Sequence, residues 1–136
     1  MTVKNNIEEG TDFIPKFDKN GLIPVIAQDV GTGDILMVAY MNRQSLDLTI
    51  ETGYATYFSR SRQALWKKGQ ESGHLQKVVQ ILVDCDQDCL VLKVAVDAGQ
   101  CHTGRQSCFY RALRKDNMKK LDFIAKKVFD PKDAYG

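Results

Sequence analysis

The chain has 136 residues, a formal net charge of +2, and an ordinary balance of 43% hydrophobic and 26% charged residues. This length and balance predict one globular domain with a core of its own. The small net charge argues against a nucleic-acid partner. No apolar run reaches the roughly 20 residues that a membrane span needs, and residues 1–10 are too polar for a signal peptide. We therefore expect a cytoplasmic protein without membrane or nucleic-acid partners.

The first part of the chain divides into an arm and a hairpin. Residues 1–20 are polar and predict a partly ordered N-terminal arm with one helical turn, followed by a single domain over residues 21–136. Apolar runs at 22–27 and 35–41 flank a turn rich in Gly and Asp, which predicts two paired strands. Pro24 cannot donate to a strand ladder, so we expect the first strand at a sheet edge.

A helix and a further strand are expected next. Asn42 is a good N-cap and Gly53 a good C-terminal stop for a helix over residues 43–52. Residues 54–59 have the composition of a strand. The polar stretch 59–74 predicts a long loop, and long loops in compact domains are usually functional.

Two β-branched runs, 76–83 and 90–96, flank a cluster of Asp and Cys residues. They predict either a hairpin with the cluster at its connection or one long strand bent there. Residues 107–115 predict a short helix, and 121–129 a final strand that ends before Pro131. The fold class is therefore α+β, mainly antiparallel sheet with a few short helices.

The carboxylates of Asp84, Asp86 and Asp88 alternate along the chain. This spacing puts them on one face of a strand or into one concave turn. Three like charges so close repel one another unless a cation lies among them, and oxygen ligands suit Mg²⁺, Mn²⁺ or Ca²⁺. An EF-hand is excluded because Cys89 stands at the sixth position and Ala95 at the twelfth. A solvated acidic turn is the alternative.

All four cysteines lie in one short stretch, at Cys85, Cys89, Cys101 and Cys108. In a reducing compartment such a cluster favours metal binding over disulfides. Four thiolates make a closed structural zinc site, whereas three leave a position for water, as in catalytic zinc sites. On an extended strand Cys85 and Cys89 are roughly 13 Å apart, too far for one ion, but a turn removes that objection. Buried free thiols are the remaining alternative.

The two histidines, His74 and His102, each fit three roles. A histidine can be a metal ligand, a general acid or base near neutral pH, or a surface residue. Because His102 follows Cys101 directly, we favour a functional role for it.

A basic segment precedes the metal cluster. Ser59, Arg60, Ser61 and Arg62 alternate hydroxyl and guanidinium groups, and the segment continues with Lys67, Lys68 and Gly69, then Ser72, Gly73 and His74. Guanidinium groups and Gly-rich backbone suit phosphate, while Trp66 and Tyr57 suit stacking on a base. The segment therefore predicts a phosphorylated substrate, with a solvated basic loop as the alternative.

From about Gly21 to the C-terminus, the sequence resembles the phosphoribosyl-AMP cyclohydrolase family of histidine biosynthesis. The resemblance is carried by the stretches 36–42 (LMVAYMN), 57–62 (YFSRSR), 65–69 (LWKKG), 72–74 (SGH), 84–88 (DCDQD), 101–104 (CHTG), 107–109 (SCF) and 129–132 (FDPK), with Tyr135 and Gly136 at the end.

This resemblance implies an intertwined homodimer with one Zn²⁺ and one Mg²⁺ per subunit. By residue-wise transfer, three cysteines and a water hold the zinc ion, the first cysteine coming from one chain and the other two from its partner. The zinc ligands are Cys85, Cys101 and Cys108. The magnesium ligands are Asp84, Asp86 and Asp88.

The implied reaction is hydrolytic opening of the adenine ring of 1-(5-phosphoribosyl)-AMP at its N1–C6 bond, giving the formimino-carboxamide ribotide. A zinc-bound hydroxide attacks the ring, and His102 or His74 moves the protons. The residues expected to bind the substrate and its phosphates are Ser59, Arg60, Ser61, Arg62, Trp66 and Lys68.

The sequence departs from the family pattern at two places. Gln70-Glu71 stands where the family usually has Glu-Thr, which leaves no role assigned to that position. Cys89 replaces a Thr or small residue, and we interpret it as a packing thiol. No fused pyrophosphohydrolase domain follows, so we expect the preceding pathway step on another polypeptide.

Two other functions are also compatible with parts of this sequence. A zinc nucleotide deaminase uses similar chemistry, but its H-x-E…P-C-x-x-C signature is missing here. A zinc-stabilised nucleic-acid-binding module requires a closed four-cysteine site and a basic loop.

Overall fold

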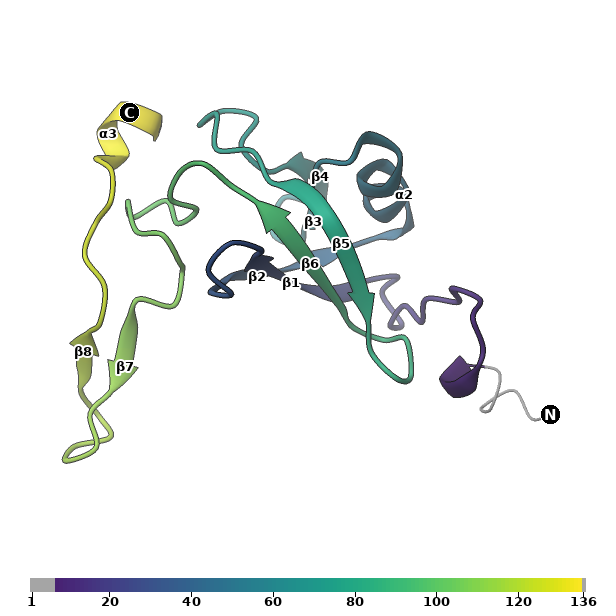
Figure 1. Cartoon of the computed structure of the whole chain (residues 1–136), viewed down its shortest axis with the longest axis horizontal. Helices are drawn as coiled ribbons and strands as arrows, with labels where there is room; N and C mark the ends of the chain where they lie inside the picture. Colours follow the sequence, from purple (N-terminus) through teal and green to yellow (C-terminus); the bar gives the residue numbers. More distant parts are fainter. Residues whose placement is uncertain (1–6, 136) are drawn as a thin grey trace.

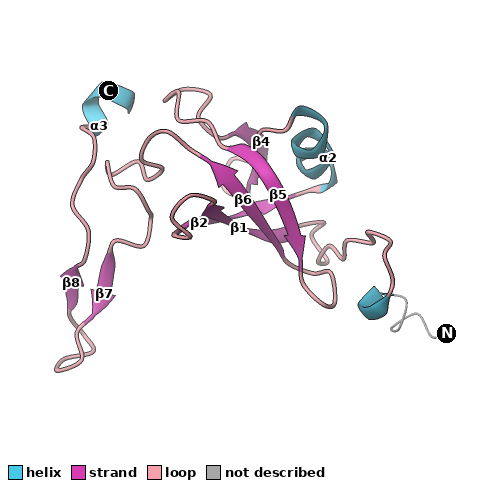
Figure 2. Cartoon of the chain, in the orientation of Figure 1, coloured by secondary structure: helices cyan, strands magenta, loops and turns pink. Residues whose placement is uncertain are grey.

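The computed structural model describes residues 7–135. Its largest element is a four-stranded sheet with the strand order β2-β1-β6-β5 (Figure 1). Two small two-stranded sheets, β3-β4 and β7-β8, complete the β structure (Figure 2). The elements are β1 (Ile23–Asp29), β2 (Ile35–Met41), α2 (Arg43–Thr52), β3 (Thr56–Ser59), β4 (Ala64–Lys67), β5 (Lys77–Val83), β6 (Leu90–Ala95), β7 (Arg111–Leu113), β8 (Leu121–Phe123) and α3 (Pro131–Tyr135). The predicted α+β class is confirmed, and among these strands only β1 and β6 pair in parallel.

The predicted first hairpin is confirmed, because β1 and β2 pair antiparallel from Ile23 and Met41 onward. The predicted edge position of β1 is wrong, since this strand lies between β2 and β6. Pro24 is tolerated there because the pairing with β6 begins only at Val25. The missing N–H of Pro24 therefore lies outside the ladder between β1 and β6.

The helix α2 forms where the sequence predicts it, with both ends capped. The Asn42 side chain accepts from the backbone N–H of Ser45 at 2.8 Å, and the Ser45 hydroxyl accepts from the N–H of Asn42 at 2.9 Å. This reciprocal pair satisfies two backbone donors that the helix leaves without intrahelical partners. Gly53 ends the helix with φ of 78°, a left-handed conformation that suits glycine. Leu46 and Thr49 are buried on the inner face.

The core is formed mainly by alternating residues of the sheet. In β1, the side chains of Ile23, Val25 and Ala27 are buried and those between them are more exposed, as expected for a strand with one face on the core. The fully buried Tyr57 of β3 donates its hydroxyl proton to Gln76 Oε1 at 2.6 Å. Gln76 in turn donates to Gln100 Oε1 at 3.0 Å, which ties the segment after β6 to the core.

The structure corrects three further sequence-based predictions. The stretch 59–74 is not a continuous loop, because β4 pairs with β3 and places Trp66 opposite Tyr57. Residues 107–115 form no helix, since β7 lies there and pairs with β8. The strand predicted over 121–129 covers only Leu121–Phe123, and a short helix starts at Pro131. The predicted helical turn of the N-terminal arm is present at residues 7–9.

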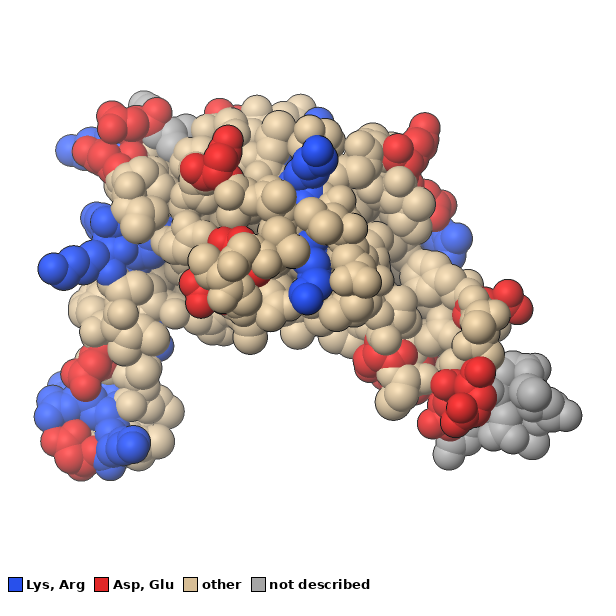
Figure 3. Space-filling model, viewed as in Figure 1, with Lys and Arg blue, Asp and Glu red and all other residues tan. Residues whose placement is uncertain are grey.

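The last part of the chain, residues 109–135, stands off the sheet and is called here the C-terminal arm (Figure 1). Large apolar side chains of this arm are exposed, namely Phe109, Leu113, Met118, Leu121, Phe123, Ile124 and Val128. Figure 3 shows charged side chains gathered at both ends of the molecule, while the middle of this face is mostly neutral surface with a few acidic and basic side chains. Within residues 7–135, no helix has the length and apolarity needed to span a membrane.

Candidate metal centres

Residues 84–89 connect β5 to β6 and form what is called here the carboxylate turn. The predicted hairpin is thus confirmed, with the Asp-Cys cluster at its connection. The turn closes through hydrogen bonds from Gln87 N to Asp84 O at 3.1 Å and from Asp84 N to Cys89 O at 3.2 Å. Gln87 adopts φ of 59°, which reverses the chain in a short distance.

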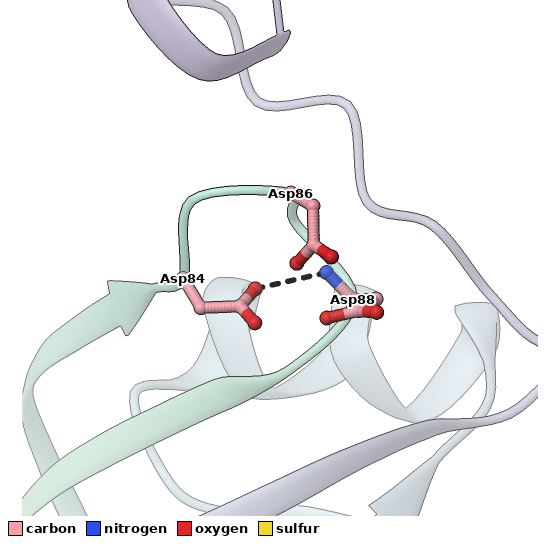
Figure 4. Close-up of side chains that lie close together, drawn as sticks. All are labelled: Asp84, Asp86 and Asp88. Carbon is pink, nitrogen blue, oxygen red and sulfur yellow. Dashed lines mark hydrogen bonds between the residues drawn. The ribbon is translucent and has the colours of Figure 1, made fainter. Parts of the chain in front are cut away.

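The side chains of Asp84, Asp86 and Asp88 converge within this turn (Figure 4). One ligand atom from each residue lies within 4.8 Å of the others, and all three residues are exposed. Asp84 Oδ1 also accepts from the backbone N–H groups of Asp88 at 2.9 Å and Cys89 at 3.1 Å. Three oxygen ligands so arranged fit a hard divalent cation.

The carboxylates of this turn alter one another's pKa. For Asp84, desolvation is the largest single contribution and acts to raise the pKa, but hydrogen bonds with Asp88, Cys89 and Asp86 together lower the pKa below its usual value. Hydrogen bonds with the Asp86 and Asp84 carboxyls, and their nearby negative charges, raise the pKa of Asp88 to about 6. A cation bound among the carboxylates would remove the part of this increase that comes from the neighbouring negative charges.

Residues 99–108 form the second candidate centre, called here the thiol loop. Cys101 N donates to Arg105 O at 3.0 Å, and Gly104 N donates to Cys101 O at 3.0 Å, so the loop folds back on itself. Gly104 has φ of 95°, and a Cβ there would lie 2.4 Å from the carbonyl oxygen of Phe129. The loop is anchored to the sheet by a hydrogen bond from Cys108 N to Leu36 O at 2.8 Å.

Two of the predicted zinc thiols meet in the thiol loop. Cys101 is buried, and its sulfur accepts a hydrogen bond from the Thr103 hydroxyl at 3.1 Å. Desolvation raises the pKa of the Cys108 thiol to about 12 although the residue is exposed, with further contributions from the charge of Cys101 and a hydrogen bond to it. The ammonium group of Lys68 acts in the opposite direction. Lys68 is only 4% exposed, and this burial lowers the pKa of its ammonium group, while the charges of Cys108 and Cys101 act to raise that pKa.

The third predicted zinc thiol lies elsewhere. Cys85 is exposed in the carboxylate turn, before β6, whereas Cys101 and Cys108 follow β6. Six strand residues span roughly 20 Å, so the sheet holds Cys85 and the thiol pair at opposite ends of β6 (Figure 1). Cys89 is half-buried near its own end of β6, with its sulfur 4.0 Å from Leu90 O. Within the described chain, therefore, no three thiols form one site.

The two candidate histidines both belong to the surroundings of the thiol loop. His102 is exposed and directly follows the buried Cys101. The ring of His74 makes an edge contact with Phe129, with 4.7 Å between ring centroids. Phe129 N also donates to Gly104 O at 3.2 Å, which brings His74 near the same loop.

The predicted phosphate segment is the turn between β3 and β4. The guanidinium of Arg60 stacks on the Tyr40 ring, 4.0 Å from its centroid, while Arg62 Nε donates to the Ser59 hydroxyl at 3.4 Å. Ser61 is exposed, and its hydroxyl lies 3.4 Å from that of Ser59. Tyr57 is fully buried and packs against Trp66, so it is not available to stack on a base.

Three of the predicted substrate residues share a cavity of about 370 Å³, namely Arg62, Trp66 and Lys68. Arg60 lies outside it and lines a different cavity with Asn42 and Phe58. The two arginines therefore face different spaces, and Lys68 lies between the shared cavity and the thiols. The burial of Lys68 beside Cys101 was not predicted, because these two residues are far apart in the chain and meet only in the fold.

The matching family model and the related proteins all have the same name. Residues 37–110 match the family model described as Phosphoribosyl-AMP cyclohydrolase. A protein of that name from Methanococcoides burtonii is 57% identical over 120 residues, covering 88% of this chain and 94% of its own. Relatives with the same name from Rhodopseudomonas palustris and Rhizobium leguminosarum are 53% and 54% identical, covering 97% and 98% of this chain and 90% and 91% of theirs.

Proposed function

The chain belongs to the phosphoribosyl-AMP cyclohydrolase family, and on this premise we propose that it opens the adenine ring of 1-(5-phosphoribosyl)-AMP in histidine biosynthesis. The observation that carries the proposal is that residues 37–110, which match the family model, include the converging carboxylates and the adjacent thiols. The reaction adds water oxygen to C6 and breaks the N1–C6 bond. N1 takes up a proton, and the amino group stays on C6 as a carboxamide.

We propose that Cys101 and Cys108 bind Zn²⁺ together with Cys85 of a second copy of the chain. The donor chemistry fits, since thiolates select zinc over harder cations, and two of the thiols are already adjacent. The position of Cys85 at the other end of β6 supports a second chain as the source of the third ligand. Zinc bound by three thiolates leaves a position for water and lowers the pKa of that water to about 7.

The apolar surface supports a homodimer. Phe123, Ile124 and Val128 of the C-terminal arm are 66%, 64% and 61% exposed. On β5, Val79, Leu82 and Val83 are exposed as well. Apolar surface of this extent usually marks an interface. In the proposed dimer, the second copy covers this surface and supplies its Cys85 to the thiol loop.

The carboxylate turn is proposed to hold Mg²⁺ through Asp84, Asp86 and Asp88. The residues fit this ion because their oxygens converge and remain exposed to water, which Mg²⁺ retains in its coordination shell. Magnesium supplies positive charge for a phosphate or for the developing charge of the reaction.

The remaining predicted residues are proposed to hold the substrate and move protons. Arg62, Trp66 and Lys68 line one cavity, where a guanidinium, an aromatic face and an ammonium suit a phosphorylated nucleotide. Arg60 and the hydroxyls of Ser59 and Ser61 are proposed to contact the second phosphate. His102 and His74 are the candidates for delivering the proton to N1.

The test is an ultraviolet assay of phosphoribosyl-AMP turnover by the purified protein, before and after a chelator and again after zinc and magnesium are restored. We expect turnover that the chelator abolishes and the metals restore. The absence of turnover by the metal-loaded protein would refute the proposal. Release of ammonia from an adenine nucleotide would instead identify a deaminase.

A further inference from the structure

Gln87 differs from its neighbours in the carboxylate turn. It is 6% exposed, although Asp86 and Asp88 on either side are exposed. It also adopts φ of 59°, a left-handed conformation that is unfavourable for a residue with a Cβ. A buried amide in a strained position requires partners that hold it there.

Those partners come from the start of the chain. Gln87 Oε1 accepts from the backbone N–H of Ile14 at 2.6 Å. Gln87 Nε2 donates to the carbonyl oxygens of Ile7 and Asp12, both at 3.2 Å. The main-chain oxygen of Gln87 accepts from Lys16 N at 2.7 Å. One residue thus binds residues 7–17, called here the N-terminal segment, through four hydrogen bonds, and this segment passes beside the carboxylates (Figure 4).

Gln63 shows that the left-handed conformation alone does not create such contacts. Among the described residues other than glycine, Gln63 and Gln87 are the two with positive φ. Gln63 is exposed, and its amide donates only to the nearby Arg60 O at 2.7 Å. Gln87 instead joins segments more than 70 residues apart in sequence.

The contact also shapes the space beside the proposed metal ligands. A cavity of about 470 Å³ lies between the N-terminal segment and the hairpin, and its lining includes Phe13, Asp84, Cys85 and Gln87. The N-terminal segment is therefore one wall of the space next to a carboxylate and a thiol. The side chain of Gln87 fixes that wall to the turn.

We propose that Gln87 is a positioning residue that clamps the N-terminal segment onto the carboxylate turn and so holds Asp84, Asp86 and Asp88 in their converged arrangement. The proposal rests on the proposed function, which assigns a divalent cation to these carboxylates. The clamp holds the left-handed backbone at position 87. The carboxylates on both sides of that position are then directed to the same point as Asp84.

The test measures Mn²⁺ binding to the full chain by electron paramagnetic resonance, with Mg²⁺ as competitor, and requires no substrate. Gln87→Met keeps the length of the side chain but removes all three hydrogen bonds of its amide. We expect affinity to fall about tenfold, the lower end of the loss caused by removing outer-sphere partners of a metal site. The matched control is Gln28→Met, which removes one amide hydrogen bond to Gly33 O outside the turn. It should bind Mn²⁺ as the unmodified protein does.

A second variant approaches the contact from the other side. Ile14→Pro removes the N–H that donates to Gln87 Oε1 and leaves the turn intact, and Ile14 already precedes Pro15. We expect weaker Mn²⁺ binding by Ile14→Pro than by the unmodified protein. Combining Ile14→Pro with Gln87→Met should cause no additional loss, because the hydrogen bond that Ile14→Pro removes is already absent in Gln87→Met.

The outcomes separate this proposal from the proposed function. If the unmodified protein binds no Mn²⁺ or Mg²⁺, the cation assignment fails. If the unmodified protein binds and folded Gln87→Met binds equally well, only the positioning role is refuted. Should Gln87→Met not fold, Ile14→Pro decides, and unchanged Mn²⁺ affinity in that variant would refute the role.

Discussion

The carboxylate turn and the thiol loop lie at opposite ends of β6 and differ in how complete they are. In the turn, three candidate ligands come from five consecutive residues, and their ligand atoms lie within 4.8 Å of one another in one chain. In the loop, Cys101 and Cys108 are adjacent, but the third predicted zinc ligand lies beyond the strand. The proposed hard-cation site thus takes all its carboxylates from one short turn of a single chain. The proposed soft-metal site additionally requires a second chain.

The first way to test this comparison is to remove a thiol at each end of β6. Cys101→Ser should abolish zinc binding. Turnover should fall by more than about 100-fold, because removing a ligand costs more than removing an outer-sphere partner of the metal. Cys89→Ser should retain zinc and activity, because its thiol lies near Leu90 O rather than in the thiol loop. Zinc per chain, by atomic absorption, and turnover are the measurements. Loss of zinc in Cys89→Ser would favour a four-cysteine structural site.

The second test asks whether the ligands come from different chains. Cys85→Ser and Cys108→Ser should each be inactive alone. After unfolding and refolding together, random pairing forms heterodimers in which one of two sites keeps all three thiols. We expect about a quarter of the unmodified activity to return, as a twofold assembly requires. Mixed proteins that stay inactive while forming heterodimers would contradict shared ligands.

The third test concerns the charge beside the thiols. Lys68→Met removes the ammonium that favours the thiolate of Cys108, so the pKa of this thiol should rise further. Because zinc binds thiolates and releases their protons, we expect about tenfold weaker zinc binding at neutral pH, recovering as the pH is raised. The control is Lys67→Met, whose ammonium lies over the Tyr54 ring. Equal zinc titrations for both variants would exclude the role of Lys68.

The smallest expected effect is in the carboxylate turn. The pKa of Asp88 is raised to about 6 from an ordinary value of 3.8, so the folded state binds its proton more tightly than the unfolded state. Stability without metal should therefore decrease as the pH rises from about 4 to 6. Asp88→Asn should lack this part of the decrease, and Mg²⁺ should offset it in the unmodified protein. Urea unfolding of both proteins in chelator at pH 5 and pH 7.5 measures how much stability each loses between the two pH values. An equal loss in the unmodified protein and in Asp88→Asn would contradict the prediction.

The sequence predicted those parts of the fold that local patterns determine. Asn42 and Gly53 mark the ends of α2 because capping depends on a few consecutive residues. The hairpin around Asp84 follows from two β-branched runs joined by polar residues. The convergence of the carboxylates was likewise predicted from their spacing in the sequence.

The predictions that were wrong or missing concern features that depend on contacts between residues far apart in the sequence. Pro24 suggested an edge strand, but the parallel neighbour β6 comes more than 60 residues later in the chain and leaves Pro24 outside their ladder. Residues 107–115 showed no local strand pattern, and β7 exists through its pairing with β8. The burial of Lys68 beside the thiols and of Gln87 under the N-terminal segment also arises only in three dimensions.

The length of β6 has a consequence for how metal is acquired. Because the strand keeps Cys85 away from Cys101 and Cys108, a solitary chain offers zinc only two neighbouring thiolates. Under the proposed assembly, zinc binding and chain association are linked by mass action. Dilution then favours zinc release, and zinc in turn strengthens pairing. The metal content of a preparation becomes a function of its protein concentration.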